Sequence, residues 1–335
     1  MALLLASCSS NDNDLLPENP VNATPIQVSQ SVQGMVKTRA AVGVGSDVTA
    51  TVLVADGSSN NADAADWANF SPVLANEVKE ENGQNKLKTR ATVSTASFKA
   101  GSNATVSLNP ILYYHTTTGT KSWLAAVAPA GTVSGTTVTI PQTDGEQDVM
   151  LADAAEAGSS NSASDPELTF KHLTTQLNFE MKVTAKNGGE WTDKTISLKK
   201  ISVRGAQVPA EVNVAPASGT AGVSKWTDAA VMNVAGISNV ALGADAVRVG
   251  NPLMIQASGQ VVIDAVISVG GTDITFNNVT IKKQDDANLS TVAGKSHLIT
   301  LNVTEPLTPE DATKMTVTAT VTDWVAGDAG NADLN

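Results

Sequence analysis

Two segments near the ends of the chain alternate apolar and polar residues with a period of two. Residues 26–36 are IQVSQSVQGMV, and residues 314–325 are KMTVTATVTDWV. The apolar positions are Ile26, Val28, Val32 and Val36 in the first segment and Met315, Val317, Ala319 and Val321 in the second. Because a period of two places successive side chains on opposite faces of a strand, both segments are predicted to be half-buried β-strands.

Similar segments recur along the chain, separated by glycine, asparagine, aspartate and proline. The expected strands are residues 47–55, 87–98, 104–114, 122–128, 136–140, 168–185, 195–203, 210–214, 252–257, 260–269, 273–281 and 297–303. Gly270-Gly271 predicts a tight hairpin turn between two of them. A short turn is expected around residues 62–69, and no segment has the pattern of a long amphipathic helix. The fold is predicted to be all-β, and short strands at this spacing indicate β-sandwiches.

A length of 335 residues indicates two domains. The small polar stretch at residues 155–166 is the expected boundary between them. The first sandwich would then span residues 26–165 and begin with strand 26–36. The second would span residues 166–335 and include strand 315–325.

The only cysteine, Cys8, lies in the sequence Leu5-Ala6-Ser7-Cys8, which resembles a bacterial lipobox. The resemblance implies cleavage before Cys8 and attachment of a diacyl group, and two acyl chains anchor a protein stably to a membrane. The following residues are polar, acidic and proline-bearing, so residues 1–25 are interpreted as a lipoprotein signal and tether. The alternative is an apolar N-terminus with a chance cysteine.

Composition argues against several classes of function. The net charge is −12 and no cluster of Lys and Arg is present, which argues against a nucleic-acid partner. The three histidines, His115, His172 and His297, are isolated from one another and lack the spacing of metal ligands. No combination of acid, base and nucleophile suggests an enzyme, and no cofactor or metal is expected.

Several sequence motifs occur in an order that resembles the fimbrillin family of Bacteroides-type bacteria. They are KTRAAVGVGSDVTATVLV from Lys37, DGEQDVMLADAAEAG from Asp144, PELTFKHLTTQLNFEMKV from Pro166 and AGKSHLITLNV from Ala293. The resemblance implies two transthyretin-like Greek-key sandwiches and export as an outer-membrane lipoprotein. It also implies cleavage by an arginine-specific trypsin-like protease, followed by polymerisation into a cell-surface fimbria by strand exchange between subunits. The family is cut after an arginine in the loop beyond the first strand, a position that Arg39 occupies, with Ala40 as the new N-terminus.

The four-residue motif Lys-Thr-Arg-Ala occurs twice, around Arg39 and around Arg90, and these are two of only four arginines in the sequence. Arg39 follows the first predicted strand and precedes a glycine-bearing stretch, whereas Arg90 lies inside a longer alternating run. Because a protease requires an extended and mobile segment, Arg39 is predicted to be the processing site. Arg90 is expected to be an edge-strand or loop residue.

A cut after Arg39 would sever residues 26–36 from the rest of their sandwich. Departure of that strand would leave a groove of apolar side chains and unpaired backbone groups, which invites another strand. Residues 315–325 of a second copy have a matching alternation and are the candidate donor. Alternatively, residues 315–325 are simply the last strand of their own domain. A second function is also open, that of a non-polymerising surface lipoprotein that binds a glycan or a host protein through sandwich loops.

Overall fold

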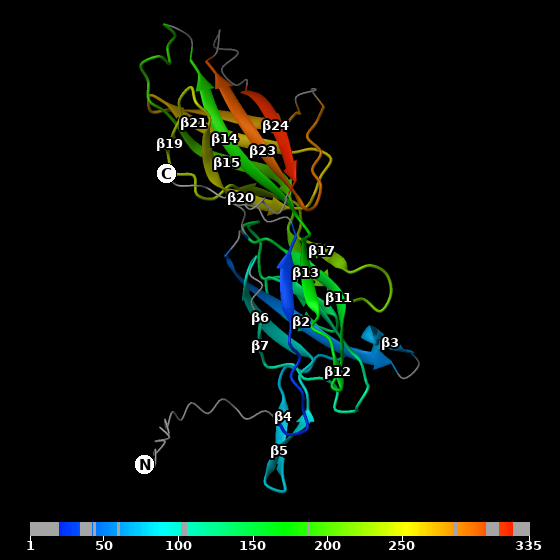
Figure 1. Ribbon diagram of the computed structural model, residues 1–335. Helices are drawn as coiled ribbons and strands as arrows, with labels where there is room; N and C mark the ends of the chain where they lie inside the picture. Colours follow the sequence, from blue (N-terminus) through cyan, green and yellow to red (C-terminus); the bar gives the residue numbers. More distant parts are fainter. Residues whose placement is uncertain are drawn as a thin grey trace, which may run out of the picture.

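The computed structural model describes residues 20–33, 42, 45–58, 61–101, 106–185, 188–283, 287–305 and 315–323. Nearly all of its regular structure is β-strand, and the one helical turn in these ranges is the 3₁₀ segment η1, Trp67–Asn69. The all-β fold predicted from the alternation is confirmed. Figure 1 shows the strands in two groups placed end to end, with the hairpin of β4 (Glu77–Glu81) and β5 (Gln84–Thr89) at one extremity.

The first group is built on a nine-stranded sheet. Its order is β1 (Ser29–Val32), β13 (Glu167–His172), β11 (Met150–Ser159), β8 (Ser122–Ala128), β2 (Asp47–Ser58), β6 (Val93–Lys99) and β7 (Ser107–Asn109). Two short strands extend it, since β3 (Asn61–Ala65) pairs with β2 and β12 (Ser162–Ala163) pairs with β11. β1 is therefore at an edge of the sheet, where its partner is β13.

Both faces of the central strands are covered, as β8 illustrates. Leu124, Ala126 and Ala128 belong to one hydrophobic cluster, which also contains residues 26, 28 and 32. Ala125 and Val127 point the other way, into a second cluster. Burial on both faces explains why β8 has an almost continuous apolar sequence, SWLAAVA, instead of a strict alternation.

The second cluster lies against a four-stranded sheet of β17 (Gly222–Trp226), β16 (Pro209–Asn213), β10 (Thr137–Thr139) and β9 (Thr132–Ser134). This sheet joins chain segments from both sides of residue 165, since β10 pairs with β16. β13 likewise pairs with β11, so residues 167–172 belong to the nine-stranded sheet. The division of the chain into two transthyretin-like Greek-key domains at 165/166 stays a prediction, but hydrogen-bonded sheets extend across that point.

The second group consists of two sheets that enclose a third hydrophobic cluster. One sheet has the order β20 (Val247–Ile255), β14 (Thr175–Thr184), β23 (Lys295–Thr304) and β24 (Met315–Asp323). The other has the order β18 (Ala230–Asn233), β15 (Ile196–Ala206), β21 (Val262–Val269) and β22 (Thr272–Thr280), and β19 (Val240–Ala241) pairs with β15. Gly270 and Gly271 form the β21–β22 turn with positive φ values of 57° and 92°, as the sequence predicted.

Three expected strands are shorter or broken. The run 87–98 divides into β5 and β6, because Ala91 N donates to Asn76 Oδ1 instead of joining a ladder. The run 168–185 divides into β13 and β14 at Leu173 and Thr174. In the described part of the run 104–114, residues 106–114, the three-residue strand β7 is the only strand, and the chain leaves the ladder at Pro110. At Ala91 and at Pro110, hydrogen bonds with side chains from other segments take the place of the ladder that the local pattern would extend.

His297 on β23 is almost fully buried, with 1% of its surface exposed, and neither ring nitrogen has a hydrogen-bond partner in the described structure. Its neighbours in the sheet are Leu177 on β14 and Val321 on β24. Burial in this apolar layer lowers the pKa of His297 from 6.5 to about 4. The native state therefore holds the imidazole neutral at pH values where the unfolded chain would protonate it.

We expect the free energy of unfolding to fall as the pH is lowered from about 6.5 towards about 4. In that range the unfolded chain binds a proton that the native state refuses, so acid favours unfolding by on the order of 2 kcal/mol. Urea unfolding of the wild type and of His297→Leu at pH 7 and pH 4.5 measures the difference. His115→Gln, which changes a half-exposed histidine, is the matched control. Equal pH dependence in His297→Leu and the wild type would contradict this account.

Candidate functional site

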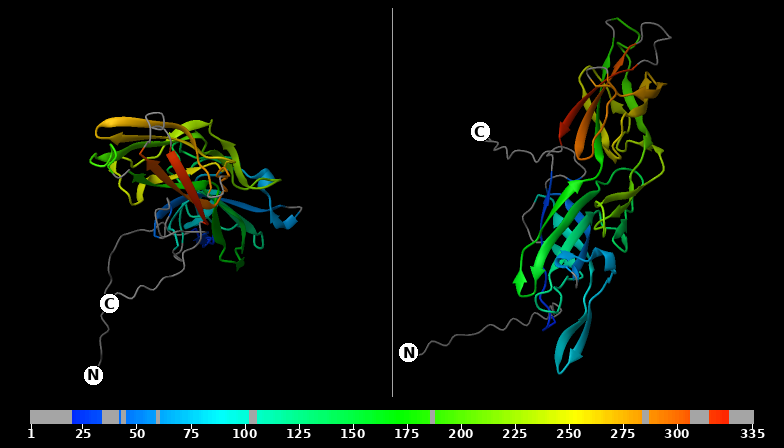
Figure 2. Two further views of the ribbon diagram at one scale, coloured as in Figure 1. Left: turned by 90° about the horizontal axis from the view of Figure 1, so that it is seen from above. Right: turned by 90° about the vertical axis from the view of Figure 1, so that its right-hand side faces the viewer.

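The candidate site is the groove that holds the leading segment, residues 20–33. In Figures 1 and 2 this segment runs as an extended chain along the first group of strands and reaches β13. Its first residues lie beside β5: Val21 N donates to Asn85 O at 2.9 Å, and Asn22 exchanges two hydrogen bonds with the backbone of Leu87. Residues 20–25 were assigned to the tether from their composition. They are instead bonded to the body of the protein.

The middle of the leading segment lies against residues 110–114, here called the wall segment. Tyr114 N donates to Thr24 O at 3.0 Å, and Ile26 N donates to Leu112 O at 2.9 Å. Tyr114 is itself fixed by its hydroxyl, which donates to Ala157 O at 2.9 Å. Burial raises the pKa of both Tyr113 and Tyr114, so these phenols stay neutral.

The last part of the leading segment is strand β1, which pairs in parallel with β13. The register matches Ser29 with Glu167 and Val32 with Phe170. Beyond β1, Gln33 N donates to Phe170 O at 2.9 Å, and the carbonyl of Gln33 accepts from His172 Nε2 at 2.8 Å. The other ring nitrogen of His172 lies 2.7 Å from the buried Asp148 carboxylate. His172 is thus a structural histidine with both ring nitrogens engaged.

The inward side chains of the leading segment complete the first hydrophobic cluster. Ile26, Val28 and Val32 expose only 3%, 2% and 5% of their surface and pack into the cluster that contains Phe98 and Phe170. Gln30 occupies the remaining inward position, and its side chain donates to Lys99 O at 3.1 Å. The sequence analysis did not assign Gln30 to the site because it is polar. Its even-numbered position between Val28 and Val32 is the signal that could have found it.

Four predicted site residues lie outside the described residues: Cys8, Val36, Arg39 and Ala40. Their roles in lipidation, strand displacement and processing stay predictions. The described chain ends at Gln33 on one side of the predicted cut and resumes with Val42, which packs on the same hydrophobic cluster as the leading segment.

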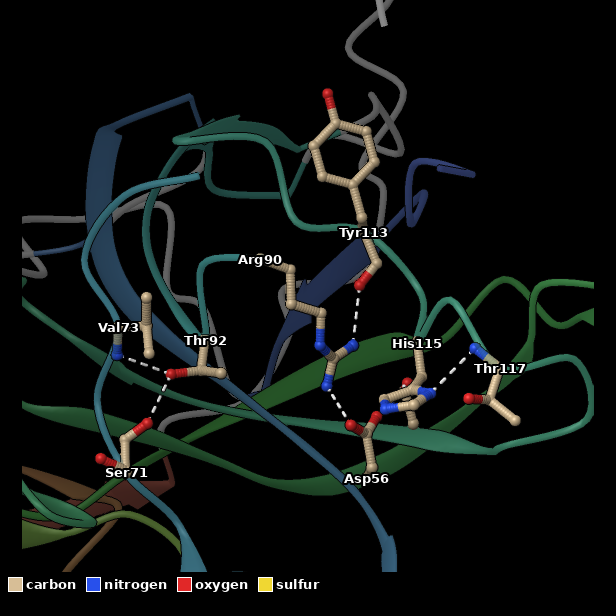
Figure 3. A network of polar contacts seen from close by, with 9 residues as sticks. Asp56, Ser71, Val73, Arg90, Thr92, Tyr113, His115 and Thr117 are labelled. Atoms are coloured by element: carbon tan, nitrogen blue, oxygen red, sulfur yellow. Dashed lines mark hydrogen bonds and ion pairs between the residues drawn. The ribbon is translucent and has the colours of Figure 1, made fainter. Parts of the chain in front are cut away.

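Arg90, in the second Lys-Thr-Arg-Ala motif, lies between β5 and β6 with only 11% of its side chain exposed. Figure 3 shows its guanidinium between the Tyr113 carbonyl and the Asp56 carboxylate. Nη1 donates to Tyr113 O at 2.8 Å, and Nη2 forms an ion pair with Asp56. Asp56 also accepts from Ser122 Oγ at 2.8 Å, which fixes the acceptor. Arg90 is a loop residue, as expected, but one locked into a tertiary network.

The candidate donor coincides with β24. Its backbone pairs antiparallel with β23 of the same chain through nine register pairs, from Lys295 with Asp323 to Val303 with Met315. β24 ends the order of its sheet, so β23 is its only neighbour in that order. In this single chain residues 315–323 therefore occupy their own sheet. Whether they are also donated to another copy stays a prediction for Met315, Val317, Ala319 and Val321.

Within the described ranges, no three His, Cys, Asp or Glu side chains gather closely enough to hold a metal ion. No helix in those ranges has the length and apolarity required to span a bilayer.

A family model described as fimbrillin-like matches residues 53–324. No curated protein matches the chain. Among solved structures, a Bacteroides uniformis protein assigned to cell adhesion is 14% identical, with a TM-score of 0.46 and coverage of 89% of this chain and 98% of the other. A fimbrial protein from Bacteroides vulgatus is 12% identical, with a TM-score of 0.40 and coverage of 90% and 100%. A fimbrial assembly protein from Parabacteroides distasonis is also 12% identical, with a TM-score of 0.38 and coverage of 90% and 99%.

Structural similarity with such low identities and TM-scores adds no argument about function, so the family assignment depends on the family model. That model covers 272 residues, from within β2 to beyond β24. The match thus includes Arg90, the nine-stranded sheet except β1 and the start of β2, and all but the last residue of the candidate donor. The chain belongs to the fimbrillin-like family, a family of cell-surface fimbrial proteins and not of enzymes.

Proposed function

We propose that the chain is a structural subunit of an adhesive surface fimbria, assembled by exchange of the leading segment for a strand of another subunit. Lipid on Cys8 holds the precursor at the outer membrane, and an arginine-specific trypsin-like protease cuts between Arg39 and Ala40. The leading segment then departs, and residues 315–325 of another copy, or of a related pilin, enter the groove. The observation that carries this proposal is the burial of the leading segment's apolar side chains at a sheet edge.

The burial of Ile26, Val28 and Val32 sets the scale of the driving force. Each buried aliphatic side chain contributes about 1.5–3 kcal/mol, so three contribute roughly 5–9 kcal/mol. This is comparable with the whole stability of a typical domain, about 5–15 kcal/mol. A vacated groove therefore favours capture of a replacement strand. The rest of the nine-stranded sheet keeps its own ladders, because among the described strands β1 pairs with β13 alone.

The spacing of the candidate donor fits the groove. The inward positions of the leading segment are 26, 28, 30 and 32, at intervals of two. Met315, Val317, Ala319 and Val321 have the same interval, so one register places all four inward at once. Donation requires β24 to leave β23, and its edge position makes this possible without disrupting β14 or β20. A head-to-tail contact of this kind does not close on itself and builds filaments.

Accessibility of the arginines supports Arg39 as the cut. Arg90 is mostly buried and engaged at both terminal nitrogens. Arg204 and Arg248 lie within strands β15 and β20. A protease must take the arginine side chain and its neighbours in an extended form, which these three positions oppose.

Arg39→Ala is expected to abolish processing, because it removes the side chain that the protease binds. The cell should then retain an uncut, lipidated precursor and form no fimbriae. N-terminal sequencing of surface protein and electron microscopy measure the two effects, with Ala40 expected at the wild-type terminus. Arg204→Ala, which removes a partly exposed arginine paired with Asp264, is the matched control and should be processed normally. Normal fimbriae from Arg39→Ala would refute the proposed cut and favour a non-polymerising lipoprotein.

A synthetic peptide of residues 315–325 is expected to terminate growing filaments, because it fills the groove without supplying a groove of its own. The same peptide with Val317→Asp and Val321→Asp should fail, since it would place charges in the apolar cluster. A third peptide with Thr318→Asp and Thr320→Asp changes only the outward face and should still terminate growth. Filament length in an assembly assay separates the three. Full-length filaments from protein truncated after Pro309 would contradict the donor assignment.

A further inference from the structure

The wall segment, residues 110–114, is held mainly by side chains of the body and not by the leading segment. Its consecutive carbonyls have four different donors. Pro110 O accepts from Ser94 Oγ at 2.7 Å, Ile111 O from Asn76 Nδ2 at 2.8 Å and Tyr113 O from Arg90 Nη1 at 2.8 Å. The carbonyl of Leu112 accepts from Ile26 N of the leading segment.

We propose that Ser94, Asn76 and Arg90 keep the wall segment in place after the leading segment departs, with Arg90 as the principal positioning residue. The vacated groove then retains the shape that an incoming strand requires. This inference rests on the proposed strand exchange and names the residues that control it. Departure gives up the bonds of Leu112 O and Tyr114 N with the leading segment, and a new strand can restore both.

The wall segment needs such support because it lies outside the regular ladder. β7 ends at Asn109, and after it the wall has only an isolated bridge between Tyr113 and Pro25 of the leading segment. A backbone without a ladder must satisfy its polar groups in other ways, and a segment with free carbonyls would rearrange towards water. Side-chain donors from other segments of the chain provide these bonds here. Ser94, for example, is on β6 and is 2% exposed.

Arg90 is the strongest of the three supports because its own position is fixed by the central sheet. Its ion pair reaches Asp56 on β2, and Asp56 also accepts from Ser122 on β8. Hydrogen bonds that involve a charged group are roughly twice as strong as neutral ones. Strands β2 and β8 pair with each other and not with β1, so this anchor does not depend on the leading segment.

This role also explains why the second Lys-Thr-Arg-Ala motif contains an arginine. The guanidinium of Arg90 serves two acceptors at once, which a lysine ammonium cannot reproduce with the same planar geometry. An arginine held this way is withheld from a trypsin-like protease. The Lys-Thr-Arg-Ala motif would then have a different role at each position. Around Arg39 it would permit release of the leading segment, and around Arg90 it would shape the groove for the replacement strand.

A labelled peptide of residues 20–33 tests the proposal, because the structure itself shows where this peptide binds. In the full chain, a site for an unrelated sequence-specific protease replaces residues 36–40, so the cut does not depend on Arg39. After cleavage, fluorescence anisotropy measures the Kd and the association rate of the labelled peptide as it exchanges with the leading segment. The outcome is independent of the natural protease and of the donor's identity, so failure here is distinguishable from failure of the proposed function.

We expect Arg90→Ala to weaken peptide binding by about 10- to 100-fold, the loss associated with a charged hydrogen bond. The association rate should also fall, because the peptide must then order the wall as it binds. Arg90→Lys should fall between Arg90→Ala and the wild type. Lys88→Ala is the matched control. Lys88 lies on β5, two residues before Arg90, is exposed and pairs with Glu77, so its loss should change the Kd less than about twofold.

Hydrogen exchange separates positioning from general stability. In cleaved, peptide-free protein, residues 106–114 should exchange faster in Arg90→Ala than in Lys88→Ala, whereas β21 and β22 should exchange equally in both. If Arg90→Ala does not fold, Ser94→Ala provides the same comparison, with about fivefold weaker binding expected from loss of a neutral hydrogen bond. A folded variant of either kind that binds the peptide with the Kd and association rate of Lys88→Ala would overturn the proposal.

Discussion

The structure depends on one apolar cluster in the first group of strands. The leading segment, held at the edge of the nine-stranded sheet, completes this cluster. Ile26, Val28 and Val32 fill this cluster through contacts that are noncovalent and specified by spacing. The hydrophobic effect is non-directional, so a different strand with the same spacing would satisfy the cluster equally well. The backbone bonds of the groove add direction and register. A site of this kind selects a pattern, not a particular sequence.

The sheet order places the two segments of the proposed exchange at sheet edges. Among the strands that the structure describes, β1 pairs with β13 alone, and β24 ends the order of a different sheet. The inner strands of the nine-stranded sheet are held more firmly. β8, for example, is paired on both sides and buried on both faces. Under the proposed function, the subunit would combine a fixed framework with two edges that neighbouring subunits complete. The wall segment adds a third feature, a side of the groove that is shaped by the framework itself.

The local sequence pattern predicted some strands at nearly their observed bounds. Other predictions based on it were wrong for identifiable physical reasons. SWLAAVA at 122–128 and the last strand were found at nearly their observed bounds, because burial and alternation are properties of the strand itself. The wall segment was expected to be a strand, but Ser94, Asn76 and Arg90 bond its carbonyls from elsewhere in the chain. Gln30 was overlooked because its inward direction follows from position and not from polarity.

The sequence by itself determined the all-β fold, the inward face of the leading segment and the family to which the chain is similar. All three follow from periodicity and residue order, which are local properties. The tertiary structure alone decided what the second Lys-Thr-Arg-Ala motif does. Arg90 is held by Asp56, 34 residues earlier, and by Tyr113, 23 residues later. No local pattern records such partners, because folding, and not sequence proximity, brings them together.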